Sequence, residues 1–195
     1  MLIDMKIFSS ITADDLAETI RSGAVGVLPC DTVYGLVCSA STIESVLRIY
    51  QLKHREHKPG TLIAANIDQL VKLGLKKRYM TPVADYWPGA VSVVIPCGAE
   101  LEYLHQGVGS LAVRLPAGDE LQELLRRTGP LLTSSANLPG QPPATSIEMA
   151  QLYFGSTIDF YVDGGDYSGH LSSTIVRVVD DALEVLRKGA VVLAD

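Results

Sequence analysis

Three cations fall within six residues in the segment KHREHK (53–58), which is followed by Pro59 and Gly60. The segment comes directly after a predicted helix and before a predicted strand. Arginine offers a phosphate a bidentate fork and lysine offers a point charge, so Lys53, Arg55 and Lys58 suit a phosphate site. The same cluster also suits a solvated helix C-terminus, where cations are favoured by the helix dipole. The segment alone leaves both interpretations open.

A second polar cluster follows the strand predicted over 130–135. It contains Thr133, Ser134, Ser135 and Asn137 and precedes a Pro-Gly turn. Ligands of α/β sheets gather at the carboxyl ends of strands, and loops of this kind present hydroxyl and N–H groups to anions. An ordinary turn capped by Ser and Asn side chains has the same composition.

Three further segments carry polar groups among apolar ones. Arg114 lies in the apolar strand predicted over 110–116, so its guanidinium must either pair with a carboxylate or bind an anionic ligand. Asp31 and Thr32 are a polar pair between two apolar stretches. They are candidates for a binding site, but a turn between two strands has the same pattern. The Gly-rich segment 163–166 leads to the hydroxyl residues of 172–174, and Arg187 follows.

Several common kinds of ligand or catalytic site are disfavoured, because their sequence motifs are absent or stand in the wrong context. Gly107 and Gly109 begin a G-x-G-x-x-A pattern, but it precedes a strand and does not link a strand to a helix, as a dinucleotide site requires. The chain has no G-x-x-x-x-G-K-[ST] and no G-x-S-x-G motif. His54 and His57 do not have the order of a zinc-binding H-E-x-x-H motif.

Composition limits the class of protein. The chain has 195 residues, a net charge of -6 and 47% hydrophobic residues, which fits one globular domain over 1–195. No apolar stretch is long enough to cross a membrane. Three cysteines at unrelated spacings, and an N-terminus (MLIDMKIF) without a signal-peptide pattern, predict a cytoplasmic location. The acidity argues against a protein that chiefly grips bulk nucleic acid, so any polyanion site must be local.

Helical and strand-like segments alternate, which predicts an α/β fold with a mixed sheet and helices packed against it. Helix starts are predicted near Thr12 and Asp15, and at a capping box formed by Ser41 and Glu44. The remaining predicted helices and strands cover the following ranges: helices 67–73, 118–128 and 145–154, and strands 24–30, 61–65, 90–96, 110–116, 130–135, 173–179 and 182–187, the last two joined by a turn at 180–181.

Taken in order, these segments resemble the YrdC-like family of threonylcarbamoyl-adenylate synthases in its short, single-domain form. The matching pieces are PCDTVYGL, KHREHKPGTLIAA, WPGAVSVV, SLAVRLP, TSSANLPGQPP and DGGDYSGHLSSTIV. The resemblance implies a twisted, largely antiparallel sheet with flanking helices around a concave, positively charged cavity. It also implies the formation of threonylcarbamoyl-AMP and pyrophosphate from L-threonine, bicarbonate and ATP. That product serves the modification of adenosine 37 in tRNA, completed by partner proteins.

The resemblance also implies roles for individual residues. Threonine contacts are expected at Thr32, Arg114, Thr133 and Ser173. ATP contacts are expected at Arg55, Lys58, Ser110, Ser135, Asn137, Pro143 and Arg187, with Lys53 beside them. No residue is expected to be a covalent catalyst, and Lys53, Arg55 and Arg114 are expected to position the substrates. A Mg²⁺ ion is expected to accompany ATP, its ligands unspecified, without a tightly bound organic cofactor.

Two departures from the family pattern bear on these roles. Cys30 stands where the family usually has threonine, and the segment between Arg55 and Lys58 is one residue short. Two other functions remain open: a module that binds double-stranded RNA or tRNA, and a relative with other carbamoyl-adenylate chemistry, such as the module of hydrogenase maturation proteins. The net charge of -6 disfavours the first, and the intact TSSAN and SSTIV segments disfavour the second.

Overall fold

The structure, a computed structural model, describes residues 5–180 and 182–193. The N-terminal residues 1–4 of the MLIDMKIF segment, and Asp181 of the predicted turn at 180–181, lie outside the described residues. The helices are α1 (Leu16–Arg21), α2 (Ile43–Leu52), α3 (Ile67–Lys72), α4 (Glu102–His105), α5 (Asp119–Thr128) and α6 (Ile147–Phe154). The strands are β1 (Lys6–Phe8), β2 (Gly26–Pro29), β3 (Tyr34–Ser39), β4 (Thr61–Ile63), β5 (Val91–Pro96), β6 (Ser110–Arg114), β7 (Leu131–Ser135), β8 (Phe160–Val162), β9 (Thr174–Val179) and β10 (Ala182–Arg187). Short 3-10 helices cover Lys77–Tyr79, Thr81–Tyr86, Ala99–Leu101 and Gly155–Thr157.

The described strands form one mixed sheet. Its order is β1-β8-β2-β3-β7-β4-β6-β5-β9-β10, so strands from both ends of the chain meet strands from its middle. Of the nine pairings in the described part of the chain, five are antiparallel and four are parallel. The predicted mixed and largely antiparallel α/β sheet is therefore confirmed, with the antiparallel pairings in a small majority.

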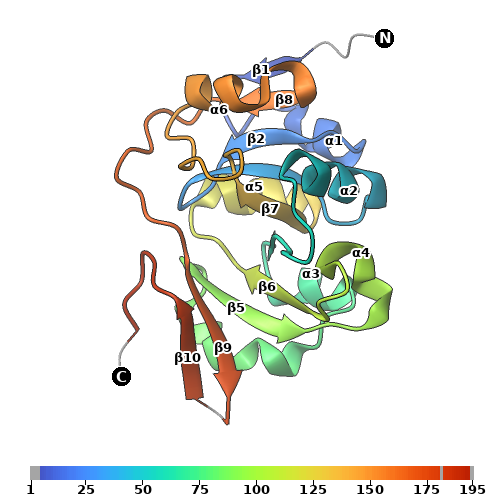
Figure 1. Cartoon of the computed structure of the whole chain (residues 1–195), viewed down its shortest axis with the longest axis vertical. Coiled ribbons are helices and arrows are strands. Elements are labelled where there is room, and N and C mark those ends of the chain that lie inside the picture. The colour runs from blue at the N-terminus through green and yellow to red at the C-terminus, as the bar shows by residue number, and fades with distance from the viewer. Residues whose placement is uncertain (1–4, 181, 194–195) are drawn as a thin grey trace.

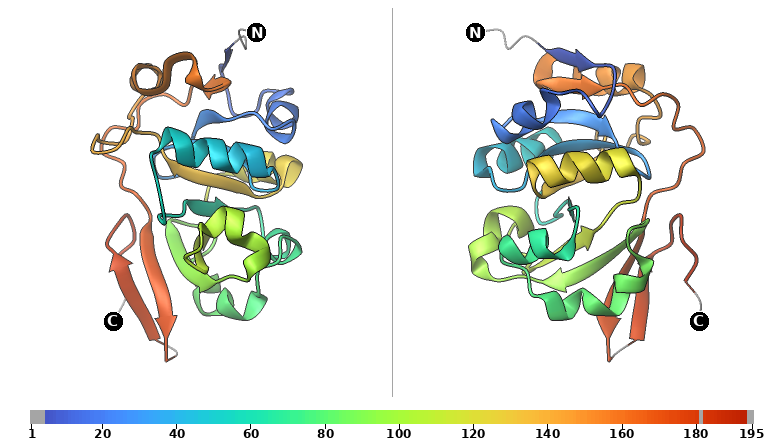
Figure 2. Two further views of the ribbon diagram at one scale, coloured as in Figure 1. Left: turned by 45° about the vertical axis from the view of Figure 1, so that its right-hand side comes forward. Right: turned by 180° about the vertical axis from the view of Figure 1, so that it is seen from behind.

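Helices cover both faces of the sheet (Figures 1 and 2). The apolar sides of α2 and α6 belong to one hydrophobic cluster, and those of α1 and α5 belong to another. Strand β2 lies between the two clusters, and all four of its residues are buried. A strand buried on both faces has a continuous apolar run, which explains the pattern that predicted it.

Two connections between strands position the polar segments. The turn after β2 reverses the chain into β3, which pairs antiparallel with β7. A long connection from β8 to β9 runs down one side of the molecule and brings residue 173 next to β5 (Figure 1). Segments 32–33, 133–135 and 172–173, which are far apart in sequence, consequently meet around one cavity.

One predicted helix start was wrong. Helix α2 begins at Ile43 with Thr42 as its N-cap, and no side chain caps it, so Ser41 and Glu44 form no capping box. Strands β1, β3 and β8 and helix α4 were not predicted. Strands β1 and β8 and helix α4 have only three or four residues, which is too short for a period of 2 or 3.6 to be recognised in a sequence. All six residues of β3 are buried, so its sequence shows no alternation of apolar and polar residues.

Close packing of β2 against β8 yields a stability prediction. A Cβ atom at Gly26 would lie 2.4–2.5 Å from ring carbons of Phe160. Gly26→Ala should therefore lower the free energy of unfolding by about 1–3 kcal/mol through overpacking. The measurement is urea denaturation of this variant, of Phe160→Leu and of the double variant. If the Phe160 ring causes the overpacking, the double variant should lose less free energy of unfolding than the sum of the two single losses. Full additivity would contradict this cause.

Candidate active site

A polar cavity of about 170 Å³ opens where the ends of β3, β4, β7 and β9 meet. We call it the arginine cavity, because three arginines and no carboxylate are among its lining residues. The residues that line the cavity are Cys30, Thr32, Val33, Arg55, Pro59, Gly60, Thr61, Ala112, Arg114, Thr133, Ser134, Ser135, Ser172, Ser173, Ile175 and Arg187. A guanidinium stays charged at neutral pH, so the lining carries three positive charges.

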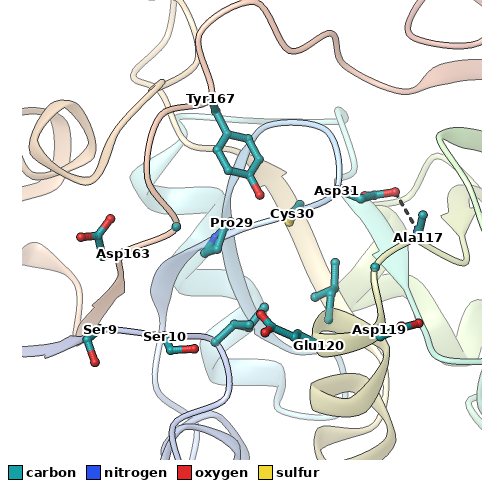
Figure 3. A pocket seen from close by; sticks show the side chains of 14 residues that line it. Ser9, Ser10, Pro29, Cys30, Asp31, Ala117, Asp119, Glu120, Asp163 and Tyr167 are labelled. Atoms are coloured by element: carbon teal, nitrogen blue, oxygen red, sulfur yellow. Dashed lines mark hydrogen bonds between the residues drawn. The ribbon is translucent and has the colours of Figure 1, made fainter.

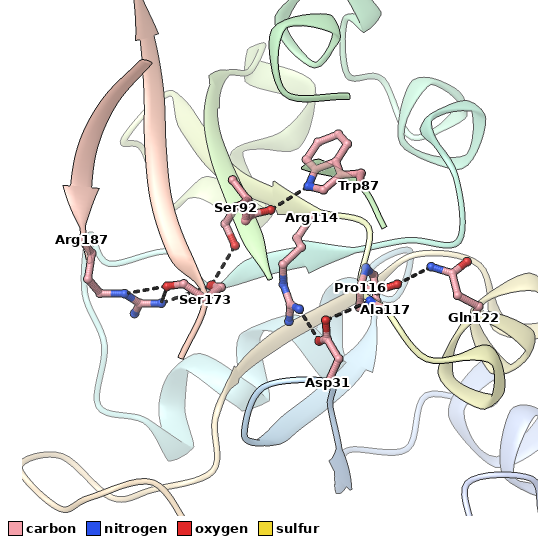
Figure 4. A network of polar contacts seen from close by, with 10 residues as sticks. Asp31, Trp87, Ser92, Arg114, Pro116, Ala117, Gln122, Ser173 and Arg187 are labelled. Atoms are coloured by element: carbon pink, nitrogen blue, oxygen red, sulfur yellow. Dashed lines mark hydrogen bonds and ion pairs between the residues drawn. The ribbon is translucent and has the colours of Figure 1, made fainter. Parts of the chain in front are cut away.

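Arg114 is held by Asp31 (Figure 4). Nη1 of Arg114 donates to Oδ1 of Asp31, and both side chains are more than 90% buried. Oδ2 of Asp31 accepts a hydrogen bond of 2.9 Å from the backbone N–H of Ala117. The ion pair therefore joins the turn after β2 to the segment that links β6 to α5.

The opposite edge of the Arg114 guanidinium is free. Nε of Arg114 is buried and has no hydrogen-bond partner among the described residues. Nε and Nη2 form the side-on edge of a guanidinium, the edge that grips a carboxylate with two parallel bonds. Leaving a buried donor unpaired costs about 1–3 kcal/mol, so this N–H is a candidate for a hydrogen bond to a ligand.

Arg187 and Ser173 form a second polar group on the cavity wall (Figure 4). The Arg187 guanidinium donates to the carbonyl oxygen of Ser173 through Nη2 at 2.7 Å and through Nε at 3.3 Å. Burial lowers the pKa of Arg187, and the charges of Arg114 and Arg55 lower it further. Burial also lowers the pKa of Arg55. Arg187 is therefore repelled by the other two arginines, and an anion bound beside it would relieve that repulsion.

Lys53 is hydrogen-bonded to the loop after β7. Its ammonium donates to the carbonyl oxygens of Ser135 (2.7 Å) and Asn137, and to the Asn137 side-chain oxygen (2.7 Å). Three N–H groups meet three acceptors, and the residue is only 3% exposed. Burial, and then the charge of Arg55, lower the pKa of Lys53 to about 7.

Asn137 is also committed to this loop. Its side-chain oxygen accepts a further hydrogen bond from the Ser135 hydroxyl at 2.7 Å, and its amide nitrogen donates to the Gln141 carbonyl at 2.6 Å. Neither Lys53 nor Asn137 lines the arginine cavity. In this structure both residues shape the loop that presents Ser135.

Of the other expected contacts, Lys58, Ser110 and Pro143 do not line the cavity either. Lys58 is exposed, and its backbone N–H donates to the side chain of Gln106, so the chain turns outward there. Ser110 lies at the far end of β6 from Arg114. The structure therefore does not bring Lys53 and Lys58 into the cavity lining with the three arginines, since Lys53 is buried against the loop after β7 and Lys58 is exposed.

The hydroxyl and thiol groups expected near threonine do come together. Thr32, Thr133 and Ser173 are each at most 7% exposed, and all line the cavity with Cys30. A Cβ atom on Gly35 would lie 2.6 Å from Oγ1 of Thr133 and 2.8 Å from Sγ of Cys30, so glycine makes room for both side chains. Burial raises the pKa of Cys30 to about 11, and the residue stays a neutral thiol.

A larger cavity of about 440 Å³ lies on the other side of the 29–31 turn (Figure 3). Cys30 lines both cavities, while Asp31 lines this one and reaches across to Arg114. The carboxylates of Asp119, Glu120 and Asp163 also line it. Their negative charges would repel an anionic ligand, so size alone does not make this cavity the better site for phosphates.

The sequence did not identify Asp31 as the partner of Arg114. The requirement that a buried guanidinium be paired was a usable signal, but Asp31 is 83 residues away and the chain offers many other carboxylates.

Within the described residues, no group of three or more His, Cys, Asp or Glu side chains is arranged to hold a metal ion. No helix in the described part of the chain is long and apolar enough to span a membrane.

The ion pair yields a stability prediction. Asp31→Ala leaves the Arg114 charge buried without a partner, so the free energy of unfolding should fall by about 3–5 kcal/mol. The control is Asp15→Ala, which removes an exposed partner of Lys6 and should cost no more than about 1 kcal/mol. Chemical denaturation measures both. Equal losses in the two variants would show that the buried pair has no special role.

The lowered pKa of Lys53 yields a pH prediction. The pKa is about 7 in the folded chain against an ordinary value of 10.5, so between these pH values the unfolded chain binds more protons than the folded chain. Lys53 should therefore make the free energy of unfolding rise with pH across this window. The measurement compares the wild type with Lys53→Met by denaturation at several pH values, with the exposed Lys72→Met as control. Parallel profiles for wild type and Lys53→Met would contradict the assignment.

Comparisons with known proteins show the family of this chain. A family model for the Sua5, YciO and YrdC proteins, described as "Telomere recombination", matches residues 18–189. The threonylcarbamoyl-AMP synthase of Pseudomonas aeruginosa (strain UCBPP-PA14) is 34% identical over 173 residues, which cover 87% of this chain and 93% of that protein. The enzyme of the same name from Bacillus subtilis (strain 168) is 31% identical over 90% of this chain and 52% of its own length.

Solved structures show the same fold. P. abyssi Sua5 complexed with L-threonine has a TM-score of 0.82 and 27% identity, covering 94% of this chain and 57% of that one. E. coli YciO has a TM-score of 0.80 and 22% identity over 95% of this chain and 96% of its own, which is a likeness of fold. Since the family model covers most of the chain and these relatives exceed 30% identity over most of it, the chain belongs to the Sua5/YciO/YrdC family.

Proposed function

We propose that this chain is an L-threonylcarbamoyladenylate synthase, which makes threonylcarbamoyl-AMP and pyrophosphate from L-threonine, bicarbonate and ATP. Relatives that carry the synthase name match most of the chain, and the related Sua5 structure holds L-threonine. The observation that carries the proposal is the unpaired, buried Nε of Arg114 in a cavity lined by arginines and hydroxyl groups.

Arg114 would bind the threonine carboxylate. Asp31 holds the guanidinium through Nη1, which leaves the Nε and Nη2 edge for two parallel bonds to a carboxylate. The guanidinium projects from β6, a strand paired on both sides, so its position is rigid. Thr32 and Thr133 would contact the remaining polar groups of the amino acid. An analogue without the hydroxyl would leave a buried polar group unpaired and bind less well.

Arg55 and Arg187 would neutralise the phosphates of ATP, with Ser135 presented by the loop that Lys53 and Asn137 support. Mg²⁺ would enter as part of the nucleotide substrate. The cavity lining offers hydroxyl and carbonyl oxygens and no carboxylate, so the ion would be held by phosphate oxygens and water, as Mg²⁺ commonly is. Lys58, Ser110 and Pro143 lie outside the cavity and would contact only the outer parts of the nucleotide.

The reaction needs charge neutralisation and positioning more than a protein nucleophile. The threonine nitrogen attacks the carbon of bicarbonate, hydroxide leaves as water, and a carbamate forms. A carbamate oxygen then attacks the α-phosphorus of ATP, and pyrophosphate leaves. Both steps bring anions together, so fixed guanidinium and hydroxyl donors in a small cavity lower their barriers. The neutral thiol of Cys30 takes no covalent part in this scheme.

The product would be passed to proteins that transfer the threonylcarbamoyl group to adenosine 37 of tRNA, in the cytoplasm. Direct binding of tRNA or double-stranded RNA would use the same local cations. The net charge of -6 makes such binding secondary to the synthase reaction.

The test is an assay of the purified chain with L-threonine, labelled bicarbonate and MgATP. We expect threonine-dependent release of pyrophosphate and a labelled adenylate. Arg55→Ala should raise the KM for ATP at least about tenfold, since a charge-assisted hydrogen bond contributes about 1.5–3 kcal/mol. The control is Arg126→Ala, which removes an exposed arginine of α5 and should behave as wild type. A wild-type chain that releases no threonine-dependent pyrophosphate would refute the function.

A further inference from the structure

Ser92 lies directly behind one of the hydroxyl groups of the arginine cavity. Its side chain is fully buried in β5, and its Oγ lies 3.0 Å from Oγ of Ser173, which lines the cavity (Figure 4). The parallel pairing of β5 with β9 brings the two residues together across 81 positions of sequence. Ser92 itself does not line the cavity.

Arg187 holds the same Ser173 hydroxyl from another direction. Its Nη2 lies 3.2 Å from Oγ of Ser173, in addition to its bonds to the Ser173 carbonyl. A guanidinium can only donate hydrogen bonds, so this contact uses one of the two lone pairs of Oγ. The second lone pair and the proton of Ser173 remain to be assigned.

Burial decides the direction of the Ser92–Ser173 bond. If Ser173 donated, the proton of the Ser92 hydroxyl would be buried at 0% exposure with no acceptor among the described residues. If Ser92 donates, its own proton is satisfied, and the proton left without an acceptor is that of Ser173, which lines the cavity where a ligand can accept it. An unpaired buried donor is the rarer and costlier state, so Ser92 is the donor. Both lone pairs of Ser173 are then occupied, by Ser92 and by Arg187.

We propose that Ser92 is a positioning residue that, with Arg187, makes Ser173 a hydrogen-bond donor into the arginine cavity. Ser173 then has only its O–H to offer a ligand, so it binds an acceptor oxygen of the amino-acid substrate and cannot accept from the substrate nitrogen. This inference rests on the proposed function and specifies that an oxygen of the amino acid, and not its nitrogen, faces Ser173.

The test is calorimetric titration of L-threonine, and separately of MgATP, into Ser92→Ala, Ser173→Ala and the double variant. Ser92→Ala should weaken threonine binding about three- to tenfold, the effect of one lost neutral hydrogen bond, and leave the MgATP affinity within about twofold. The double variant should bind threonine no more weakly than Ser173→Ala, because Ser92 acts through Ser173. The matched control is Ser45→Ala. It removes a hydroxyl of α2 that is also buried but donates to the carbonyl oxygen of Gly23.

The possible results separate this inference from the proposed function. A wild-type chain that binds no L-threonine would overturn both. A wild-type chain that binds threonine, with Ser92→Ala equal to it, would overturn the role of Ser92 alone. Equal losses of threonine affinity in Ser92→Ala and Ser45→Ala, or additive losses in the double variant, would also overturn it, because they indicate general destabilisation.

Discussion

A guanidinium that is buried must have a partner, and the pairing of Arg114 with Asp31 determines how the site is built. The uncompensated burial of one charge costs several kcal/mol, so the turn after β2 cannot move away from the end of β6 without a large penalty. The same carboxylate also accepts from the N–H of Ala117, just before α5. One side chain thus joins three segments, and it leaves Nε of Arg114 without a hydrogen-bond partner among the described residues.

This interaction also separates two cavities of different charge. The arginine cavity is lined by three arginines without a carboxylate, whereas the cavity behind the 29–31 turn is lined by four carboxylates. An acidic chain with a net charge of -6 therefore holds three of its 16 lysines and arginines where the sheet brings strand ends together. Net charge describes the outer surface and is a poor guide to a small internal site.

Much of the fold follows from local patterns in the sequence. Continuous apolar runs predict β2 and β5, and hydroxyl residues after an apolar run mark the end of β7. The short strands β1 and β8 are not predictable in this way, because they depend on pairing with each other and with β2 and on the packing of Phe8 against Phe160. Their existence depends on contacts between distant parts of the chain.

The site was predicted in kind more than in detail. Arg114, Arg187, Thr133 and Ser173 do come together, as the order of motifs suggested. The position of Lys53 against the loop that contains Asn137 depends on hydrogen bonds between segments 82 or more residues apart, which no local pattern records. Ser92 gave no signal at all, since a serine in an apolar strand is common and its partner is known only from the register of β5 with β9.

The most direct test of the account is a crystal structure of this chain with L-threonine and a non-hydrolysable ATP analogue. We expect the threonine carboxylate to accept two hydrogen bonds from Nε and Nη2 of Arg114, while Nη1 remains paired with Asp31. A carboxylate bound away from Arg114, or a complex in which Asp31 has released Arg114, would contradict the claim that the ion pair holds a preformed binding edge.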